Sequence, residues 1–151
     1  MEKLNLPEFN LTVRKNSGKV EIFDIIRKKY IVLQPEEWVR QNFIHFLIEV
    51  QGFPKSLIKV ESGLKYNSLL KRSDILIYSN EGNCSVLVEC KSFNIKINQN
   101  ALDQCTIYNK TINAEYIILT NGINHFCCKK NIDESYVFID YIPSYKKKAL
   151  E

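Results

Sequence analysis

The sequence lacks long hydrophobic runs, and this absence excludes proteins that cross a membrane as helices. No apolar stretch reaches the roughly 18 residues that a membrane-spanning helix needs. The opening residues, MEKLNLPEFN, also lack the apolar core of a signal peptide. We therefore expect a cytoplasmic protein that does not enter a membrane.

Cysteine pairs of the kind that hold zinc are also missing. The sequence has five cysteines and no C-x-x-C pair among them: Cys84, Cys90, Cys105, Cys127 and Cys128. This spacing argues against a zinc site, and the odd number is typical of reduced thiols. Cys84, Cys90 and Cys105 lie in segments with an apolar pattern, where we expect small buried thiols.

Signatures of several enzyme classes are absent as well. The chain has no GxxxxGK[ST] phosphate loop, no G-x-S-x-G elbow, no internal repeat and no low-complexity stretch. Its two histidines, His45 and His125, are far apart in the sequence, and we expect both to be structural. A length of 151 residues fits one domain, and a net charge of +4 permits nucleic acid as a partner without requiring it.

What the sequence does contain is a clear β-hairpin signal. Two short apolar runs, residues 74–78 and 84–88, flank the turn-forming residues Asn80–Asn83. A turn centred on those four residues places Asp74 directly opposite Glu89. Opposed side chains in an antiparallel pair share a face, with Cβ atoms roughly 5 Å apart.

This hairpin brings two carboxylates and a lysine to one face. Strand side chains alternate, so Lys91 shares the face of Glu89 while Cys90 points the other way. Opposed carboxylates repel each other, and a divalent cation such as Mg²⁺ between them removes the repulsion. With Lys91 to orient a water or offset phosphate charge, these are the parts of a metal-dependent phosphodiesterase. The alternative is that Asp74 forms an ordinary surface ion pair with Arg72 or Lys91.

Residues 1–34 are predicted to be an N-terminal β extension of the same domain. The turn cluster Asn16–Gly18 joins two expected strands, and residues 25–33 extend their sheet. The basic run Arg27–Lys29 is either a solvated edge or a patch that contacts phosphates.

Two helices are expected, over residues 35–51 and 99–113. The first begins with a proline at a favoured position, and the helix dipole alone explains Glu36 and Glu37 in its first turn. In the second, Gln104 and Tyr108 lie one turn apart and can face the same site. The residues expected on the inner faces are Val39, Phe43, Phe46, Leu47 and Val50, then Ala101, Leu102, Cys105, Tyr108 and Ile112.

Further strands are expected at residues 58–66, 116–119, 123–128 and 136–142, and residues 143–151 form a loose basic tail. Strand, crossover helix and strand in this order predict an α/β (α+β) fold with a mixed sheet flanked by helices. The core of the domain then covers residues 35–142.

Five short motifs follow one another along the chain: PEEWVRQ (35–41), RSDILIY (72–78), VECK (88–91), QCTIYN (104–109) and LTNG (119–122). Together they resemble the PD-(D/E)XK nuclease superfamily, and most of all the N-terminal nuclease domain of type I restriction enzyme R subunits. The resemblance covers about residues 30–131. It implies a restriction-endonuclease-like fold with a central mixed sheet in αβββαβ order.

The resemblance also implies a Mg²⁺-dependent nuclease acting on DNA in restriction–modification, with Mn²⁺ able to substitute. It puts Asp74 and Glu89 in the metal-ligand positions and Lys91 in the catalytic lysine position. Glu37 fits a helix glutamate that helps to hold the metal through water. Supporting or DNA-contacting roles fall to Arg40, Arg72, Gln104 and Tyr108.

The chain departs from this family pattern in two ways. Ser73 stands where the superfamily name has proline. R subunits also carry an ATP-driven motor after this domain, whereas this chain ends. We therefore expect a nuclease without its own motor, which acts alone, as a homodimer for double-strand cuts, or with a motor or specificity subunit in trans.

Two other functions stay open. One is a binding module of the same fold that is non-catalytic or partner-dependent, which would show salt-dependent DNA binding without hydrolysis. The other is a structural interaction protein, whose thermal stability would not respond to metal ions.

Overall fold

The computed structural model describes residues 1–62 and 73–145, and for residues 61, 62, 73 and 74 it describes the backbone alone. The N-terminal strands are β1 (Val13–Asn16), β2 (Lys19–Asp24) and β3 (Lys29–Val32). The remaining elements are α1 (Pro35–Glu49), the 3₁₀ turn η1 (Lys55–Leu57), β4 (Ile58–Ser62), β5 (Ser73–Tyr78), β6 (Cys84–Cys90), α2 (Gln99–Ile112), β7 (Tyr116–Thr120), β8 (His125–Lys130) and β9 (Tyr136–Ile139). The expected positions of Arg72, of residues 63–66 and of tail residues 146–151 lie outside the described residues.

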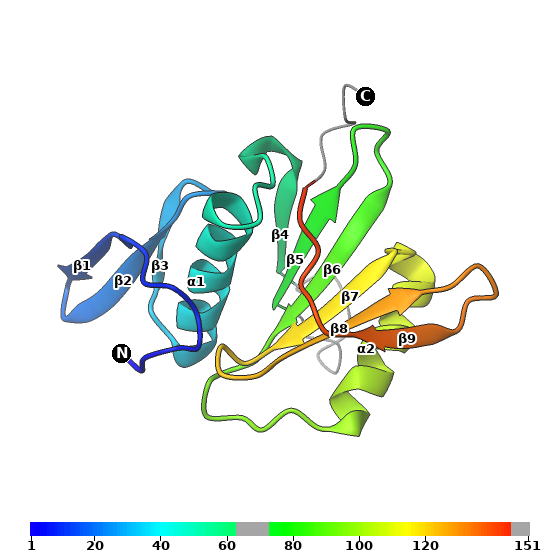
Figure 1. Cartoon of the computed structure of the whole chain (residues 1–151). Helices are drawn as coiled ribbons and strands as arrows, with labels where there is room; N and C mark the ends of the chain where they lie inside the picture. The colour runs from blue at the N-terminus through cyan, green and yellow to red at the C-terminus, as the bar shows by residue number, and fades with distance from the viewer. Residues whose placement is uncertain (63–72, 146–151) are drawn as a thin grey trace.

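The strands form two sheets, as Figure 1 shows. Strands β1, β2 and β3 make a small antiparallel sheet, and the other six pair in the order β4-β5-β6-β7-β8-β9. Only one pair in this larger sheet, β6 with β7, is parallel, and α2 is the crossover that joins them. The predicted mixed sheet flanked by helices, with an N-terminal β extension, is confirmed.

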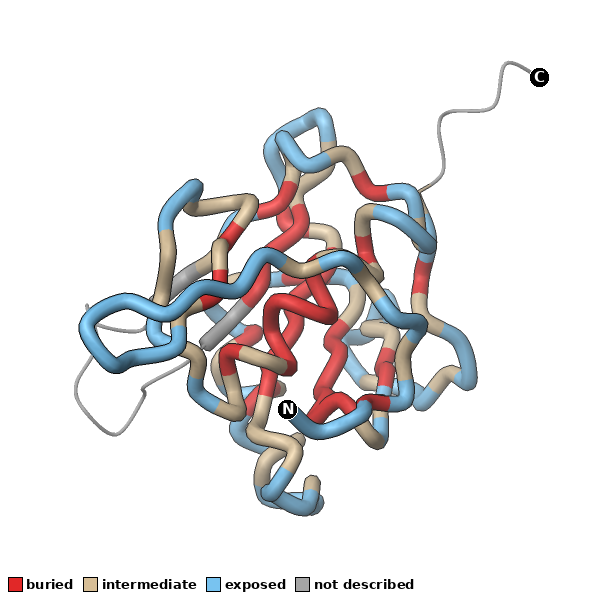
Figure 2. Tube along the Cα trace, turned by 90° about the vertical axis from the view of Figure 1, so that its left-hand side faces the viewer, coloured by how far each residue is buried: buried red, intermediate tan, exposed pale blue. Residues whose placement is uncertain are grey.

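The helices lie on opposite faces of the six-stranded sheet, and alternation along the strands decides which residues each one meets. Helix α1 packs on the face that carries Ile75, Val88 and Ile118. The other face meets α2: Leu76 and Leu87 cluster with Tyr108, and Ile117 and Leu119 cluster with Cys105. Figure 2 shows that burial concentrates in α1 and the central strands, whereas the N-terminal hairpin is exposed.

Most of the expected inner-face residues of α1 are buried, but the assignment of Val50 was wrong. Val39, Phe43 and Leu47 are fully buried, whereas Val50 is 51% exposed. The helix ends at Glu49, and the chain then turns through a residue with a positive φ, Gly52. This turn sends the side chain of the next residue, Phe53, into the core in place of Val50.

The N-terminal segment crosses the turn between β7 and β8. The amide of Asn5 donates to the carbonyl of Gly122, with a distance of 2.8 Å between nitrogen and oxygen. Gly122 has φ +86°, and a Cβ at this position would lie 2.7 Å from Cδ2 of Leu4. Glycine is required here for its left-handed backbone and for the close approach of the N-terminal segment. This contact gives the LTNG motif a structural role.

The cysteines behave as small core residues. All five are buried and reduced, which confirms the expectation for Cys84, Cys90 and Cys105. Burial raises the pKa of Cys84 to about 11 and that of Cys127 to about 12, so both thiols stay protonated near neutral pH. Neither helix in the described ranges is long and apolar enough to span a bilayer.

Candidate active site

Strands β5 and β6 pair in the predicted register. Asp74 is the backbone partner of Glu89, and the pairs Ile75 with Val88 and Leu76 with Leu87 follow. Near the turn the register shifts by one residue. Because the shift occurs beyond these pairs, it leaves the positions of Asp74 and Glu89 opposite each other. The predicted pairing of Asp74 with Glu89 is therefore confirmed for the backbone.

The pairing continues across the sheet and adds a third acidic position. Glu61 of β4 is the backbone partner of Asp74, and on the other side Glu89 pairs with Leu119 of β7. Positions 61, 74 and 89 thus form one row on the face of the sheet that α2 covers. Sequence reasoning missed Glu61, although a Lys-Val-Glu alternation in a predicted strand was the available signal.

Glu89 is the buried member of this row. It is only 4% exposed, so its charge needs a partner. Nζ of Lys91 lies 3.5 Å from Oε1 of Glu89, and the lysine side chain is 30% exposed. The backbone amide of Lys91 donates to the carbonyl of Thr120 at 2.8 Å, which anchors this residue beyond the end of β6. Lys91 therefore reaches from a fixed backbone position to both Glu89 and solvent.

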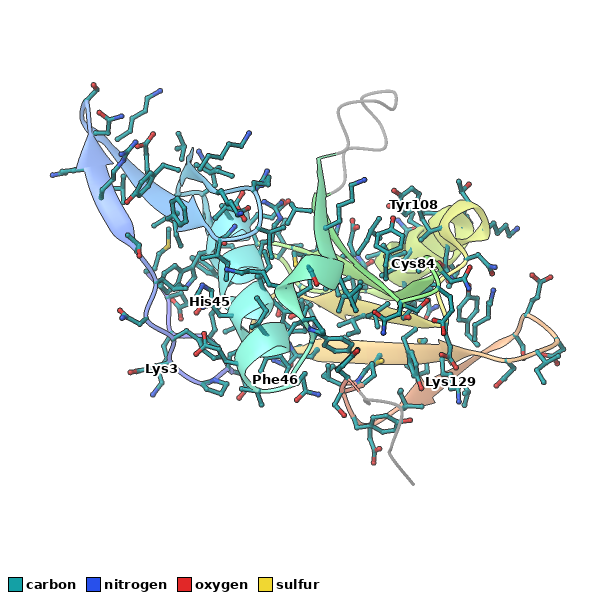
Figure 3. The ribbon with its side chains drawn as sticks, turned by 90° about the horizontal axis from the view of Figure 1, so that it is seen from above. Lys3, His45, Phe46, Cys84, Tyr108 and Lys129 are labelled. Atoms are coloured by element: carbon teal, nitrogen blue, oxygen red, sulfur yellow. The ribbon has the colours of Figure 1, made fainter. Side chains whose placement is uncertain are left out.

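Helix α2 places Tyr108 beside the row. Its ring packs among Leu76 and Leu87, the next pair on the same face of the hairpin after Asp74 and Glu89. Figure 3 shows Tyr108 near Cys84, between α2 and the sheet. Gln104 is exposed and lies one helical turn earlier on the same helix. The structure thus places Tyr108 on the face of the sheet that carries the row, and the role of Gln104 stays a prediction.

A buried asparagine fixes the end of α2, and no sequence pattern pointed to it. The side chain of Asn109 accepts a hydrogen bond from the amide of Ala114 at 2.8 Å and donates to its carbonyl at 3.0 Å. It also donates to the hydroxyl of Tyr136 at 2.9 Å. Asn109 is the last residue of the QCTIYN motif, so the motif combines two site positions with one structural residue.

Glu37 and Arg40 belong to α1, which lies on the other side of the sheet from the carboxylate row. Arg40 lies close to Cys90, whose side chain alternates with that of Glu89 to the opposite face. The carboxylate of Glu37 accepts from Nη1 of Arg40 and, at 2.8 Å, from Nε2 of Gln41. Arg27 adds two longer contacts of 3.4 Å. The metal-ligand role predicted for Glu37 would require these contacts to open.

Asp24 completes this buried polar network. It accepts from Nε of Arg27 at 2.6 Å and from Nε2 of Gln41 at 3.0 Å. Burial by itself raises the pKa of Asp24, but the hydrogen bonds from Arg27 and Gln41 outweigh it and hold the pKa below its usual value. The predicted basic patch at residues 27–29 is therefore divided, because Arg27 points inward while Lys28 and Lys29 are exposed.

The two histidines are structural in this fold. His45 pairs with Glu49 at 2.7 Å on α1. His125 contacts the hydroxyl of Thr120 at 2.7 Å and the carbonyl of Asn5 at 3.0 Å. Neither interaction involves the carboxylate row.

The described side chains hold no group of three His, Cys, Asp or Glu residues arranged to bind a metal. The side chains of positions 61 and 74 are not among those described. The carboxylate row is therefore inferred from the backbone register and from the described side chain of Glu89. A groove of about 830 Å³ lies elsewhere, at the turn end of β5 and β6, and is lined by Tyr78, Tyr116 and Tyr141 among others. The predicted site residues are not part of its lining.

Comparison with families of known proteins gives a match that covers most of the chain. The model of the family described as type I restriction enzyme R protein N terminus (HSDR_N) matches residues 35–143, from the first residue of α1 to just beyond β9. No curated protein and no solved structure matches the chain. The matched range contains the carboxylate row, both helices and the whole six-stranded sheet. The chain belongs to the type I restriction enzyme R protein N-terminal family.

Proposed function

We propose that this protein is a Mg²⁺-dependent nuclease of the PD-(D/E)XK type that hydrolyses DNA phosphodiester bonds. The observation that supports this most is the register of β5 and β6, which sets Asp74 opposite Glu89 with Lys91 on the same face. Membership of a restriction enzyme family makes DNA the expected substrate and other restriction subunits the expected partners. A cytoplasmic location and a homodimer stay predictions.

The donor set suits a hard divalent cation. Asp74 and Glu89 offer carboxylate oxygens, which Mg²⁺ prefers, and the buried Glu89 lies beside the ammonium group of Lys91. Bound there, the metal would activate a water and stabilise charge on the leaving oxygen. Mn²⁺, which also prefers oxygen ligands, would substitute.

Lys91 has a role that Glu89 and Asp74 do not supply. Its ammonium group donates hydrogen bonds only, so it can hold a water or neutralise a phosphate oxygen as negative charge develops. The hydrogen bond from its own amide to the carbonyl of Thr120 fixes the backbone, while the side chain, which is 30% exposed, keeps Nζ accessible. We infer that Gln104 and Tyr108 support this face of the site and contact DNA.

The test separates metal binding from chemistry. Calorimetric titration of Mg²⁺ and Mn²⁺ and a DNA cleavage assay are run on the wild type, Asp74→Ala and Lys91→Ala. We expect Asp74→Ala to lose both metal binding and cleavage. Lys91→Ala should retain metal binding and lose cleavage by a factor of about 10² to 10³, as when a charge-stabilising donor is removed.

Lys110→Ala, an exposed lysine on α2, is the matched control and should cleave like the wild type. Unchanged cleavage in Asp74→Ala or Lys91→Ala would rule out the assigned roles. Metal binding without cleavage in the wild type would instead favour a partner-dependent binding module.

A further inference from the structure

Two phenylalanines lie exposed on the same face of the sheet as the carboxylate row. Phe126 of β8 is 43% exposed and Phe138 of β9 is 60% exposed. Phe126 pairs with Leu119, and Phe138 pairs with Cys128, so alternation puts both rings on the face that meets α2. Aromatic side chains on the face of a sheet are often buried by another element. Two exposed rings on adjacent strands form an apolar patch, which indicates a binding site.

The two rings border a small cavity beside the start of α2. This cavity of about 140 Å³ is lined by both phenylalanines, by Ile97, Leu102 and Leu119, and by the polar residues Asn98 and Gln99. No charged residue belongs to its lining. An apolar slot with aromatic walls and amide groups accepts a flat, uncharged ring system with polar edges, which is the chemistry of a nucleobase.

The patch is continuous with the proposed active site. Glu89, Leu119 and Phe126 are consecutive partners across β6, β7 and β8, so Phe126 lies two strand spacings, or about 10 Å, from Glu89. The segment between Lys91 and α2 runs past the same edge. It is held there by the side chain of Asn121, which donates to the carbonyl of Ile95 at 2.7 Å.

Positive charge flanks this path. Lys91 stands at the row, and Lys96 is exposed in the segment that leads from the row to α2. Lys130 lies on the same strand and face as Phe126, with its ammonium group bonded to the side chain of Asn113. The acidic residue of α2, Asp103, accepts a hydrogen bond from the side chain of Gln99 at 2.9 Å. This distribution suits a chain with a phosphate backbone better than a purely apolar protein partner.

We propose that Phe126 and Phe138 form a stacking platform for unpaired DNA bases, so that the nuclease engages single-stranded DNA next to its carboxylate row. In a duplex the faces of the bases are covered by their neighbours, and only a single or frayed strand can offer them to exposed rings. The proposal rests on the proposed nuclease function for the substrate's identity, but its contacts are separate from the metal site.

The test is a binding experiment in EDTA, where metal-dependent cleavage cannot occur. Fluorescence anisotropy measures the affinity of the full chain for a labelled oligo-dT strand and for a duplex of the same length. We expect tighter binding to the single strand. Stacking contributes about 1–3 kcal/mol per base, so Phe126→Leu and Phe138→Leu should each weaken single-strand binding by about 5- to 150-fold.

Three comparisons make the outcome specific to stacking. Phe126→Trp and Phe138→Trp keep an aromatic face and should keep the affinity, whereas leucine keeps only the apolar character. Val137→Ala removes an exposed apolar side chain from the opposite face of β9 and should have no effect. Melting temperatures of all variants, measured in parallel, should match the wild type because both rings are exposed.

The results of these experiments distinguish an error in the stacking platform from an error in the nuclease assignment. Leucine variants that bind single strands as well as the wild type would overturn the platform, even if the wild type cleaves DNA. So would leucine variants that merely convert a dimer to a monomer in sedimentation, since the patch would then join two copies. Single-strand binding that depends on the rings in a protein without cleavage would support the platform and reject the nuclease.

Discussion

Asp24 shows at the scale of one residue how this fold holds a charge in its interior. Its carboxylate is fully buried and still ionised, because Arg27 and Gln41 surround it with donors. No sequence pattern singled it out, since its partner Gln41 is 17 positions away and the contact exists only once the small sheet meets α1. Local periodicity predicts which face of an element is buried, but it does not predict which buried polar groups will meet.

The lowered pKa of Asp24 predicts an acid-sensitive fold. The unfolded chain takes up a proton at a higher pH than the folded one, so the stabilisation is complete above the usual value of 3.8 and is lost as pH falls through the lowered pKa. Melting temperatures recorded from pH 7 to about pH 2.5 should therefore fall steeply at the acid end. Asp24→Asn should unfold at a lower temperature at pH 7, because its free energy of unfolding falls by roughly 3 kcal/mol. Its melting temperature should also decrease less than that of the wild type as the pH is lowered.

Asp140→Asn provides the control for this experiment, because Asp140 is exposed at the end of β9. This variant should follow the wild-type profile. The interpretation would be wrong if Asp24→Asn and the wild type lost equal stability between pH 5 and about pH 2.5.

At the scale of elements, the strongest sequence signals were the turn residues and the alternation of β5 and β6. They predicted the pairing of Asp74 with Glu89, and the structure has that pairing. The start of α2 and both faces of β7 were also predictable, because each depends on residues within one element. The third acidic position, Glu61, was missed because it depends on how β4 pairs with β5 across residues 63–72. Glu37 was correctly placed on α1, but the sequence did not show that Arg40 and Gln41 would hold its carboxylate.

The acidic row predicts an unusual response of the hairpin to substitution. Opposed like charges destabilise a strand pair by a fraction of a kcal/mol, so Asp74→Asn should stabilise the metal-free protein by about 0.2–1 kcal/mol. In EDTA its melting temperature should rise by about 1–3 °C. Adding Mg²⁺ should raise the melting temperature of the wild type and leave that of Asp74→Asn unchanged, because a ligand stabilises only the protein that binds it. A variant that melts below the wild type in EDTA would show that Asp74 is held by a cation of the protein instead.

Over the whole molecule, the N-terminal segment and α1 share a core cluster with one face of the six-stranded sheet. Leu4, from the N-terminal segment, packs in the same core cluster as Val39 of α1 and Ile118 of β7. The family match begins at Pro35, yet residues before it contribute Leu4, a fully buried Ile22 and the buried Asp24. That residues 1–34 belong to the same domain as the six-stranded sheet stays a prediction, which a shortened chain can test.

A chain that begins at Pro35 should therefore fail to fold stably, although it contains every residue that the family model matches. Losing Leu4 and Ile22 removes two buried side chains, each contributing about 2–5 kcal/mol. Removing Asp24 leaves part of a buried ion network unpaired, at a cost of roughly 3–5 kcal/mol. Their sum is comparable to the whole stability of a domain, about 5–15 kcal/mol. Chemical denaturation followed by circular dichroism should show no cooperative transition for this chain.

In the full chain, Ile22→Ala should clearly lower the denaturant concentration at the unfolding midpoint, and the exposed Val20→Ala should not. A shortened chain that unfolds cooperatively at the wild-type midpoint would mean that the N-terminal sheet is an independent appendage.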